Sequence, residues 1–401
     1  MRQRSLILAF TLSAIVLGCT SVWMLGSSLT AVTLHPVVLS DIGAEAVSLR
    51  AAPDQLVAGS YLAGQGRGAV LLLHGIRSDR RQMAERARFL QRQGYSVLLI
   101  DLPGQGASTA SAVTFGLHEA QGVRAALDEL RRRARGQRIG VIGVSLGAAS
   151  LVLCRDCGRV DAVVLESMYP TIEEAVADRL RMRLGALGGP LSALLLWQLP
   201  LRLDIDPAQL RPIDRIGELK SPLLIAAGSA DMHTTLPETL RLFAAAAGPK
   251  ELWVVQGAAH VDLHAFAPLE YERRVGALLA LEQVRGSELL EDGKVLFLKN
   301  GALPWASVVR KEMPKVLFVI SHSIAEQRYM IHTVSVSTES FEARADLPMA
   351  WAGLRDADLA AVSGVPDATF CHNGRFIAAA KSFEGIRLMA KLALQAVEQG
   401  E

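Results

Sequence analysis

The sequence predicts an α/β fold: a doubly wound, mostly parallel sheet, extended by a helical cap, an N-terminal membrane helix and a small C-terminal α+β domain. Two observations predict the sheet. Continuous apolar runs recur between residues 69 and 257, as expected for strands that are buried on both faces. Segments with a helical pattern separate these runs, and repeated strand–helix–strand crossovers produce a doubly wound sheet.

The chain begins with a long uncharged segment. Arg2 and Arg4 precede residues 6–25, which at about 1.5 Å per residue would reach about 30 Å, the thickness of a bilayer core. No clear small-residue cleavage site follows, so we expect residues 1–28 to be an uncleaved signal anchor. A cleaved signal peptide and a lipoprotein modified at Cys19 remain alternatives. With both arginines in the cytoplasm, the rest of the chain would lie outside it, in a bacterial periplasm.

The strands and helices of the sheet are expected in strict alternation. The apolar runs that we expect to be strands are AVLLLHG (69–75), YSVLLID (95–101), RIGVIGV (138–144), VDAVVLES (160–167), SPLLIAAGS (221–229) and KELWVVQG (250–257). The helical segments span residues 82–93, 117–135, 146–154, 236–247 and 268–283.

Residues 171–215 interrupt this alternation. They are rich in Leu, Gly and Pro and contain no clean strand, which predicts a helical cap folded over the site. Pro190 and Pro200 limit the apolar run to roughly ten residues, so we do not expect a second membrane segment here.

Length and charge limit the other possibilities. The chain has 401 residues, which suggests two or three domains, and we place them at 1–28, 29–283 and 284–401. The formal net charge of +2 predicts no basic surface for nucleic acid. The expected partners are therefore a small-molecule or acyl substrate and, through the N-terminal segment, a membrane.

Two of the four cysteines form a CxxC motif, Cys154 and Cys157. No second cysteine or histidine pair at useful spacing completes a zinc site. The pair lies at the end of a helix, whereas a redox pair would lie at a helix N-terminus, where thiolates are stabilised. A local disulfide and two buried thiols both remain open.

Ser145 is the candidate nucleophile. Gly143 and Gly147 flank it in a G-x-S-x-G pattern between a predicted strand and a predicted helix. Glycines at these positions avoid Cβ clashes in the sharp turn that exposes the serine hydroxyl. The context that this motif requires is therefore present in the sequence.

Asp231 and His260 complete a candidate triad. Each follows a predicted strand, and the chain order of serine, acid and histidine is the one expected for this motif. His260 would accept the proton of Ser145, and Asp231 would orient its imidazole. Asp262 is a nearby substitute for the acid.

Further histidine and backbone features could belong to the same site. His74 and Gly75 follow a strand and aim the backbone N–H of Ile76 into the site, where it could form an oxyanion hole with the N–H of Leu146. His264 lies four residues after His260 but has no third metal ligand, and neither His233, expected in the pocket or in solvent, nor His118, expected in a helix, has an assigned role.

A known family shares these motifs. HG (74–75), DLPGQGAS (101–108), GVSLGA (143–148), GSAD (228–231) and GAAH (257–260) together resemble the α/β-hydrolase superfamily, especially its serine aminopeptidase-like and prolyl-oligopeptidase-like branch. The resemblance covers about residues 45–283. It implies a serine hydrolase without metal or cofactor that cleaves an ester, thioester or amide bond through an acyl-enzyme.

The C-terminal part resembles a second family. Residues 315–382 contain three strand-like stretches and residues 383–398 a helix, and AWAGLRD, SGVP and CHNGRFI are similar to the DHH-like metal-dependent protein hydrolases of the melanocyte-proliferating-gene type. The metal-binding half of that family has no counterpart, and His322, His332 and His372 do not rebuild it. CHNGRF could contact a ligand, or it could form a hairpin turn at Asn373–Gly374.

Taken together, the sequence predicts a membrane-anchored, extracytoplasmic serine hydrolase with an appended α+β module. The alternative functions are a non-catalytic binding or scaffold protein on a hydrolase fold and a nuclease-related role of the C-terminal module.

Overall fold

The computed structural model describes residues 2–299, 305–323, 326–337, 340 and 342–400. The chain divides into two compact units, Met1–Val275 and Gly276–Glu401, which we call unit 1 and unit 2. Helix α10 (Pro268–Arg285) includes the boundary between them.

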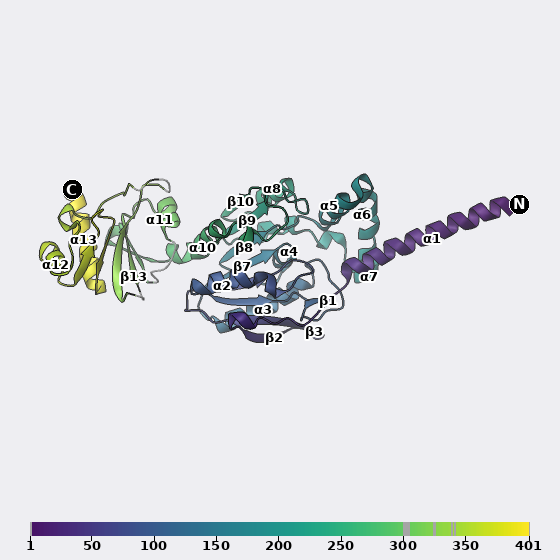
Figure 1. The fold of residues 1–401 in the computed structure, drawn as a ribbon, viewed down its shortest axis with the longest axis horizontal. Helices are drawn as coiled ribbons and strands as arrows, with labels where there is room; N and C mark the ends of the chain where they lie inside the picture. Colours follow the sequence, from purple (N-terminus) through teal and green to yellow (C-terminus); the bar gives the residue numbers. More distant parts are fainter. Residues whose placement is uncertain (1, 300–304, 324–325, 338–339, 341, 401) are drawn as a thin grey trace. The chain divides into compact units, whose positions relative to one another are not determined.

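Unit 1 is built on an eight-stranded sheet with the order β10-β9-β8-β7-β4-β5-β3-β2 (Figure 1). The six strands from β10 to β5 are parallel, whereas β3 and β2 are antiparallel additions at one edge that the sequence analysis did not assign. The strands are β2 (Glu45–Ala52), β3 (Gln55–Leu62), β4 (Ala69–Leu73), β5 (Ser96–Ile100), β7 (Ile139–Val144), β8 (Ala162–Glu166), β9 (Leu223–Gly228) and β10 (Lys250–Val255). The predicted mostly parallel, doubly wound sheet is confirmed.

Every residue of the central strands is buried, because helices cover both faces of this sheet. Helices α3 (Glu119–Arg133), α4 (Leu146–Leu153) and α8 (Leu236–Ala245) share one apolar core with the inward residues of one face. Helices α2 (Ala84–Arg92) and α10 contact each other and bury their apolar residues outside that core, as the opposite face requires.

The interruption after β8 folds as a helical cap. It contains α5 (Ile172–Leu184), α6 (Gly188–Leu196) and α7 (Gln198–Leu203), and α5 packs against α6. By length and composition alone, the described stretch Ile172–Leu203 could cross a membrane, so the apolar run is longer than the sequence analysis expected. Pro190 and Pro200 do not end it, because each lies in the first turn of a helix, where proline removes no hydrogen bond.

Helix α1 (Arg2–Thr30) precedes the sheet and projects from unit 1 (Figure 1). Its last turns contact the rest of the unit: Arg202 of α7 stacks on the ring of Trp23, 3.7 Å from the centroid, and donates to Ser27 Oγ at 2.8 Å. Upstream of these contacts, apolar side chains such as Leu12 and Leu17 are more than 60% exposed. Among the residues whose side chains the structure describes, the apolar stretch of α1 is Val16–Thr30.

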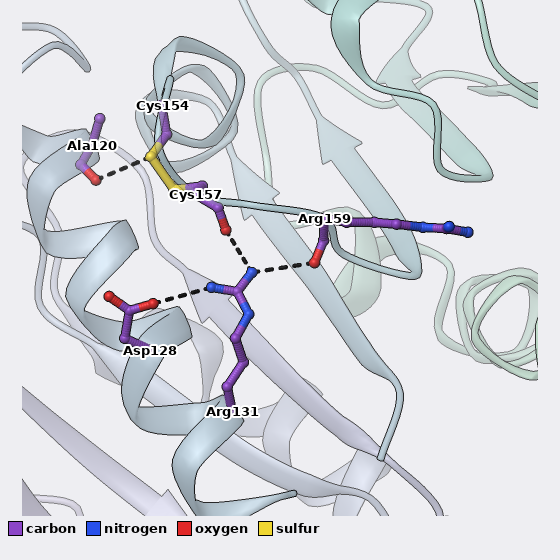
Figure 2. The surroundings of a disulfide bond; sticks show 6 residues. All are labelled: Ala120, Asp128, Arg131, Cys154, Cys157 and Arg159. Atoms are coloured by element: carbon purple, nitrogen blue, oxygen red, sulfur yellow. Dashed lines mark hydrogen bonds and ion pairs between the residues drawn. A yellow bond between two sulfur atoms is a disulfide. The ribbon is translucent and has the colours of Figure 1, made fainter. Parts of the chain in front are cut away.

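The CxxC motif forms a disulfide between Cys154 and Cys157 at the C-terminal end of α4 (Figure 2). Arg131 of α3 donates to the carbonyl oxygens of Cys157 and Arg159, at 2.5 and 3.2 Å (Figure 2). Of the two states left open by the sequence, the structure has the disulfide, and the hydrogen bonds of Arg131 link the turn after α4 to the end of α3.

Unit 2 has a six-stranded sheet with the order β11-β12-β13-β14-β16-β15, in which only β12 and β13 pair in parallel. The strands are β11 (Glu288–Leu290), β12 (Val295–Leu298), β13 (Phe318–Ser323), β14 (Arg328–Thr333), β15 (Ala368–Cys371) and β16 (Ile377–Ala380). The helices are α11 (Ala306–Glu312), α12 (Asp356–Ser363) and α13 (Phe383–Gln399), and α13 packs its apolar face on the sheet. The CHNGRF stretch forms the turn between β15 and β16, in which Arg375 takes a left-handed φ of 57°.

Candidate active site

Ser145 occupies a sharp turn between β7 and α4. Its φ of 48° and ψ of −106° are unusual for a residue with a side chain, and its N–H donates to the carbonyl oxygen of Glu166 at 2.8 Å. Both flanking glycines are needed: a Cβ at Gly147 would lie 2.6 Å from Leu73 O, and a Cβ at Gly143 would lie 2.7 Å from the backbone of the following helix. The sequence therefore folds locally into a strained elbow that places the buried serine side chain in the lining of a cavity.

Asp231 and His260 meet after strands β9 and β10. His260 Nδ1 lies 2.7 Å from Asp231 Oδ2, so Nδ1 carries the hydrogen and Nε2 is left as the basic nitrogen. Asp231 also accepts from the N–H of His233, from the N–H of Thr234 and from Thr234 Oγ1, at 2.8 to 3.0 Å. Burial alone would raise the pKa of Asp231, but the hydrogen bond from His260 and these further donors lower it. Asp231 is thus held as a carboxylate.

The substitute acid, Asp262, has other partners. Its carboxylate accepts from Arg86 Nη1 at 2.8 Å and from the N–H of Ala265 at 3.0 Å, where it caps the short helix α9 (Leu263–Phe266). Arg86 also donates to both carboxylate oxygens of Glu166 and is itself buried. Asp262 therefore belongs to a buried ion-pair network beneath the site, and Asp231 alone is paired with His260.

The loop after β4 presents one free backbone donor. The N–H of Gly75 donates to Gln82 Oε1 at 2.8 Å, and the N–H of Arg77 donates to Gln105 Oε1. Between them, the N–H of Ile76 has no protein acceptor among the described residues, and the same holds for the N–H of Leu146 at the start of α4. These are the two groups expected to form an oxyanion hole.

His74 supports this loop from below. It is fully buried, its Nε2 accepts from the N–H of Leu102 at 2.9 Å, and its Nδ1 lies 2.7 Å from Gly75 O. Burial lowers the pKa of His74, which keeps the ring neutral, as this pattern of one donor and one acceptor nitrogen requires. His74 is therefore a structural residue that fixes the position of Gly75.

A cavity of about 490 Å³ opens beside Ser145. Ile76 and Leu146 line it together with Ser145 and His233, and the ring of His233 lies 4.9 Å from that of His260. Most of the other lining side chains are apolar and come from α1, the cap and the loop before α3; they are Leu25, Leu29, Phe115, Tyr169, Ile172, Ala175, Val176, Leu180, Met182 and Leu195. This size and lining suit a small apolar or acyl ligand.

The remaining histidines of unit 1 lie away from this arrangement. His264 Nε2 lies 3.2 Å from Glu272 Oε1, and the ring packs against Phe89 and Tyr271. His118 is exposed just before α3. Among the residues that the structure describes, no three His, Cys, Asp or Glu side chains are grouped as metal ligands.

Several residues that shape the site carried no signal in the sequence. Gln82, Gln105 and Thr234 act on the site only through hydrogen bonds that the fold creates, and each is an ordinary polar residue in its local context. Arg86 and Glu166 lie 80 positions apart in the sequence, so their pairing also depends on the fold.

Comparison with known proteins assigns the two parts of the chain to different families. Residues 70–274 match the alpha/beta hydrolase family, and residues 271–394 match an uncharacterised protein family, UPF0160. An esterase of Pyrococcus furiosus has a similar fold, with a TM-score of 0.51 and 24% identity over 62% of this chain and 97% of the esterase.

Curated relatives match either part separately. An uncharacterized protein of Mycobacterium tuberculosis is 36% identical over 209 residues, which are 50% of this chain and 66% of that protein. The human MYG1 exonuclease is 32% identical over 107 residues, which are 25% of this chain and 28% of the exonuclease. The chain thus spans just under two thirds of the first relative and less than a third of the second.

Proposed function

The chain belongs to the alpha/beta hydrolase family, and we propose that it is a membrane-anchored serine esterase in which Ser145, His260 and Asp231 form the catalytic triad. The observation that carries the proposal is the 2.7 Å contact between His260 Nδ1 and Asp231 Oδ2, beside a cavity that Ser145 lines. An apolar cavity next to the serine favours esters of acyl chains.

The proposed reaction has two steps. Ser145 Oγ attacks the ester carbonyl carbon while His260 Nε2 takes the hydroxyl proton, and the negative charge on the carbonyl oxygen is held by the N–H groups of Ile76 and Leu146. The bond to the leaving alkoxide then breaks, the alkoxide takes the proton from His260, and an acyl-enzyme remains. A water molecule, deprotonated by His260, releases the acid and restores Ser145.

A fluorophosphonate probe and p-nitrophenyl hexanoate test this mechanism on the full-length chain. We expect the wild type to be labelled and to hydrolyse the ester, and we expect Ser145→Ala to lose both, with a fall in kcat on the order of 10⁶-fold. Ser150→Ala is the matched control, because Ser150 lies on the same helix and its hydroxyl bonds only Leu146 O, at 2.7 Å. Labelling that persists in Ser145→Ala would refute the assignment, and no labelling of the wild type would favour a binding protein.

Two features support the membrane anchor. The described apolar side chains of α1 upstream of the cap contacts, such as Phe10 and Leu17, are exposed. The cap carries further exposed apolar side chains on and between α6 and α7, among them Leu194, Trp197 and Leu201. Burying such side chains in a bilayer would contribute about 25 cal/mol for each Å² removed from water. The anchor and the cap would then lie at the same membrane surface.

Membrane association is tested by alkaline extraction of membranes that contain the expressed chain. We expect the wild type to stay in the pellet and the double variant Leu12→Lys, Val16→Lys to move to the supernatant. The double variant Leu240→Lys, Leu269→Lys is the control, because both side chains are also exposed but lie on α8 and α10. Full extraction of the wild type would contradict the anchor.

A further inference from the structure

Three arginine side chains line the cavity beside Ser145: Arg77, Arg179 and Arg183. Within the described residues, none of the three lies within 4 Å of an Asp or Glu carboxylate. Arg179 donates to Ala175 O at 2.7 Å and Arg77 to Ser28 O at 3.0 Å, and both acceptors are neutral carbonyl groups. Among the described residues, the cavity therefore holds three guanidinium groups that form no ion pair with a carboxylate.

Neighbouring arginines on the same helix behave differently. Arg181, two positions from Arg179 on α5, lies outside the cavity and pairs with Asp178 at 2.7 Å. Arg211 and Arg215, which follow the cap helices, pair with Asp214 and Glu218. The arginines of α5 that line the cavity thus form no ion pair with a carboxylate among the described residues. Arg181, Arg211 and Arg215, which lie outside the cavity, do form such ion pairs.

The cations are close enough to affect one another. Burial lowers the pKa of Arg179; the charges of Asp231 and Asp178 oppose this shift, and the charge of Arg77 adds to it. Burial also lowers the pKa of His233, where the charges of His260, Arg179 and Arg183 act in the same direction and that of Asp231 opposes them. A half-buried guanidinium that has no ion pair of its own is stabilised by an anion that forms charge-assisted hydrogen bonds with it.

The three arginines of the cavity differ in exposure. Arg179 is half-buried, whereas Arg77 and Arg183 are exposed. The rest of the cavity wall is apolar and includes Leu25 and Leu29 from the last turns of α1. The same cavity thus offers an apolar surface for a chain and a guanidinium fork for an oxyanion.

We propose that this cavity binds acyl esters that carry a phosphate or carboxylate group near the ester, with Arg179 as the residue that binds the anion and Arg77 and Arg183 at the entrance. This inference rests on the proposed esterase function and specifies its substrate class. The acyl chain lies along the apolar wall that α1 and the cap build, and the anion pairs with Arg179. The three arginines would discriminate against neutral esters of the same chain length.

Anion binding is tested without catalysis in the full-length Ser145→Ala chain in lipid nanodiscs. Hexyl phosphate, hexanoate and 1-hexanol share a chain length and differ in charge, so thermal shifts measured with each compare the anions with a neutral ligand. We expect hexyl phosphate or hexanoate to bind at least 10-fold more tightly than 1-hexanol, and the stronger of the two identifies the anionic group. Equal binding of all three ligands would overturn the proposal.

Substrate preference is tested with 1-hexanoylglycerol 3-phosphate, the hexanoyl ester of 3-hydroxypropanoate and neutral 1-hexanoylglycerol. The readout is the ratio of kcat/KM for each anionic ester to that for the neutral one. We expect a ratio above 10 for at least one anionic ester in the wild type and a fall of about 10-fold in Arg179→Gln. Arg181→Gln is the matched control on the same helix and keeps the wild-type ratio.

The two tests separate the inference from the proposed function. If Ser145-dependent hydrolysis is absent but hexyl phosphate or hexanoate binds through Arg179, the esterase function fails and the anion site stands. If neutral esters are hydrolysed as well as anionic ones, the esterase function stands and the anion site fails. A ratio that falls equally in Arg179→Gln and Arg181→Gln would also refute the specific role of Arg179.

Discussion

The two units of the chain both pack helices on a sheet, yet they place polar side chains differently. In unit 1, parallel strands end at one edge, and the residues that follow β4, β7, β9 and β10 bring Ile76, Ser145, Asp231 and His260 to that edge. In unit 2, neighbouring strands are mostly antiparallel, so residues that follow successive strands lie at opposite edges.

The histidines of the two units show the consequence. His322, His332 and His372 of unit 2 each lie against a different aromatic ring, of Tyr329, Trp305 and Phe376, with centroids 4.3 to 5.9 Å apart. His260 and His233 of unit 1 lie against each other beside a cavity. In the parallel sheet the carboxyl ends of the strands lie at one edge, so the residues that follow them can form a candidate site. On the antiparallel sheet the same residue types are dispersed and contact local aromatic side chains.

Among the substitutions that compare the two units, the largest effect is expected for the acid of unit 1. Asp231→Asn is expected to lower kcat by about 10⁴-fold, because an amide would no longer hold His260 in the tautomer that accepts the proton. Asp262→Asn is the matched variant and is expected to affect stability more than activity, because Asp262 pairs with Arg86. Steady-state kinetics and thermal unfolding of both variants measure this, and equal losses of kcat would show that both carboxylates serve His260.

A smaller effect is expected at the loop after β4. Gln105→Ala removes the acceptor that holds the N–H of Arg77 and would allow the N–H of Ile76 to shift, with a loss of about 10²-fold in kcat. KM for a neutral ester should change little, because the lost interaction is with the developing oxyanion. Gln91→Ala, at an exposed position of α2, is the control. A rise in KM with unchanged kcat would indicate a role in substrate binding instead.

Glu238 of α8, whose carboxyl interacts with that of Asp178 on the cap helix α5, should also make the stability of unit 1 depend on pH. Burial and the neighbouring carboxyl of Asp178 raise the pKa of Glu238 from its usual 4.5 to about 7. Between these two pKa values the folded state binds a proton that the unfolded state releases. The contribution of Glu238 to the free energy of unfolding is therefore fully present below about pH 4.5 and is lost as the pH rises through about 7.

Glu238→Gln removes this titration, and we expect its Tm to exceed that of the wild type by a few degrees at pH 8 and by less at pH 4.5. Glu218→Gln, at an exposed site, should show no such pH dependence. Differential scanning calorimetry of the three proteins at both pH values measures the effect. A Tm difference between Glu238→Gln and the wild type that is the same at both pH values would contradict the raised pKa of Glu238.

The smallest effect is expected in unit 2. Substituting His322, His332 and His372 by Asn should change ester hydrolysis by less than about twofold, because each ring contacts a local aromatic partner. Kinetics of the triple variant with p-nitrophenyl hexanoate provides the measurement. A large loss of hydrolysis would contradict a purely local packing role, since it would show that the histidines of unit 2 contribute to the reaction.

The sequence predicted the six parallel strands of unit 1, the helices between them and the serine elbow, because these depend on local properties: apolar runs, helical periodicity and glycines without Cβ atoms at Gly143 and Gly147. The topology of a parallel sheet then orders Ser145, Asp231 and His260 along one edge, so the candidate site could also be predicted.

The partners of the two nearby carboxylates depend on the tertiary structure. The chain order favoured Asp231 over Asp262, and the structure pairs Asp231 with His260, whereas Arg86, a residue of a distant helix, binds Asp262. The absence of an ion pair at Arg179 and of an acceptor for the N–H of Ile76, among the described residues, likewise depends on the tertiary structure. Hydrogen bonds and ion pairs between distant segments form only when the fold brings their partners within about 3 Å.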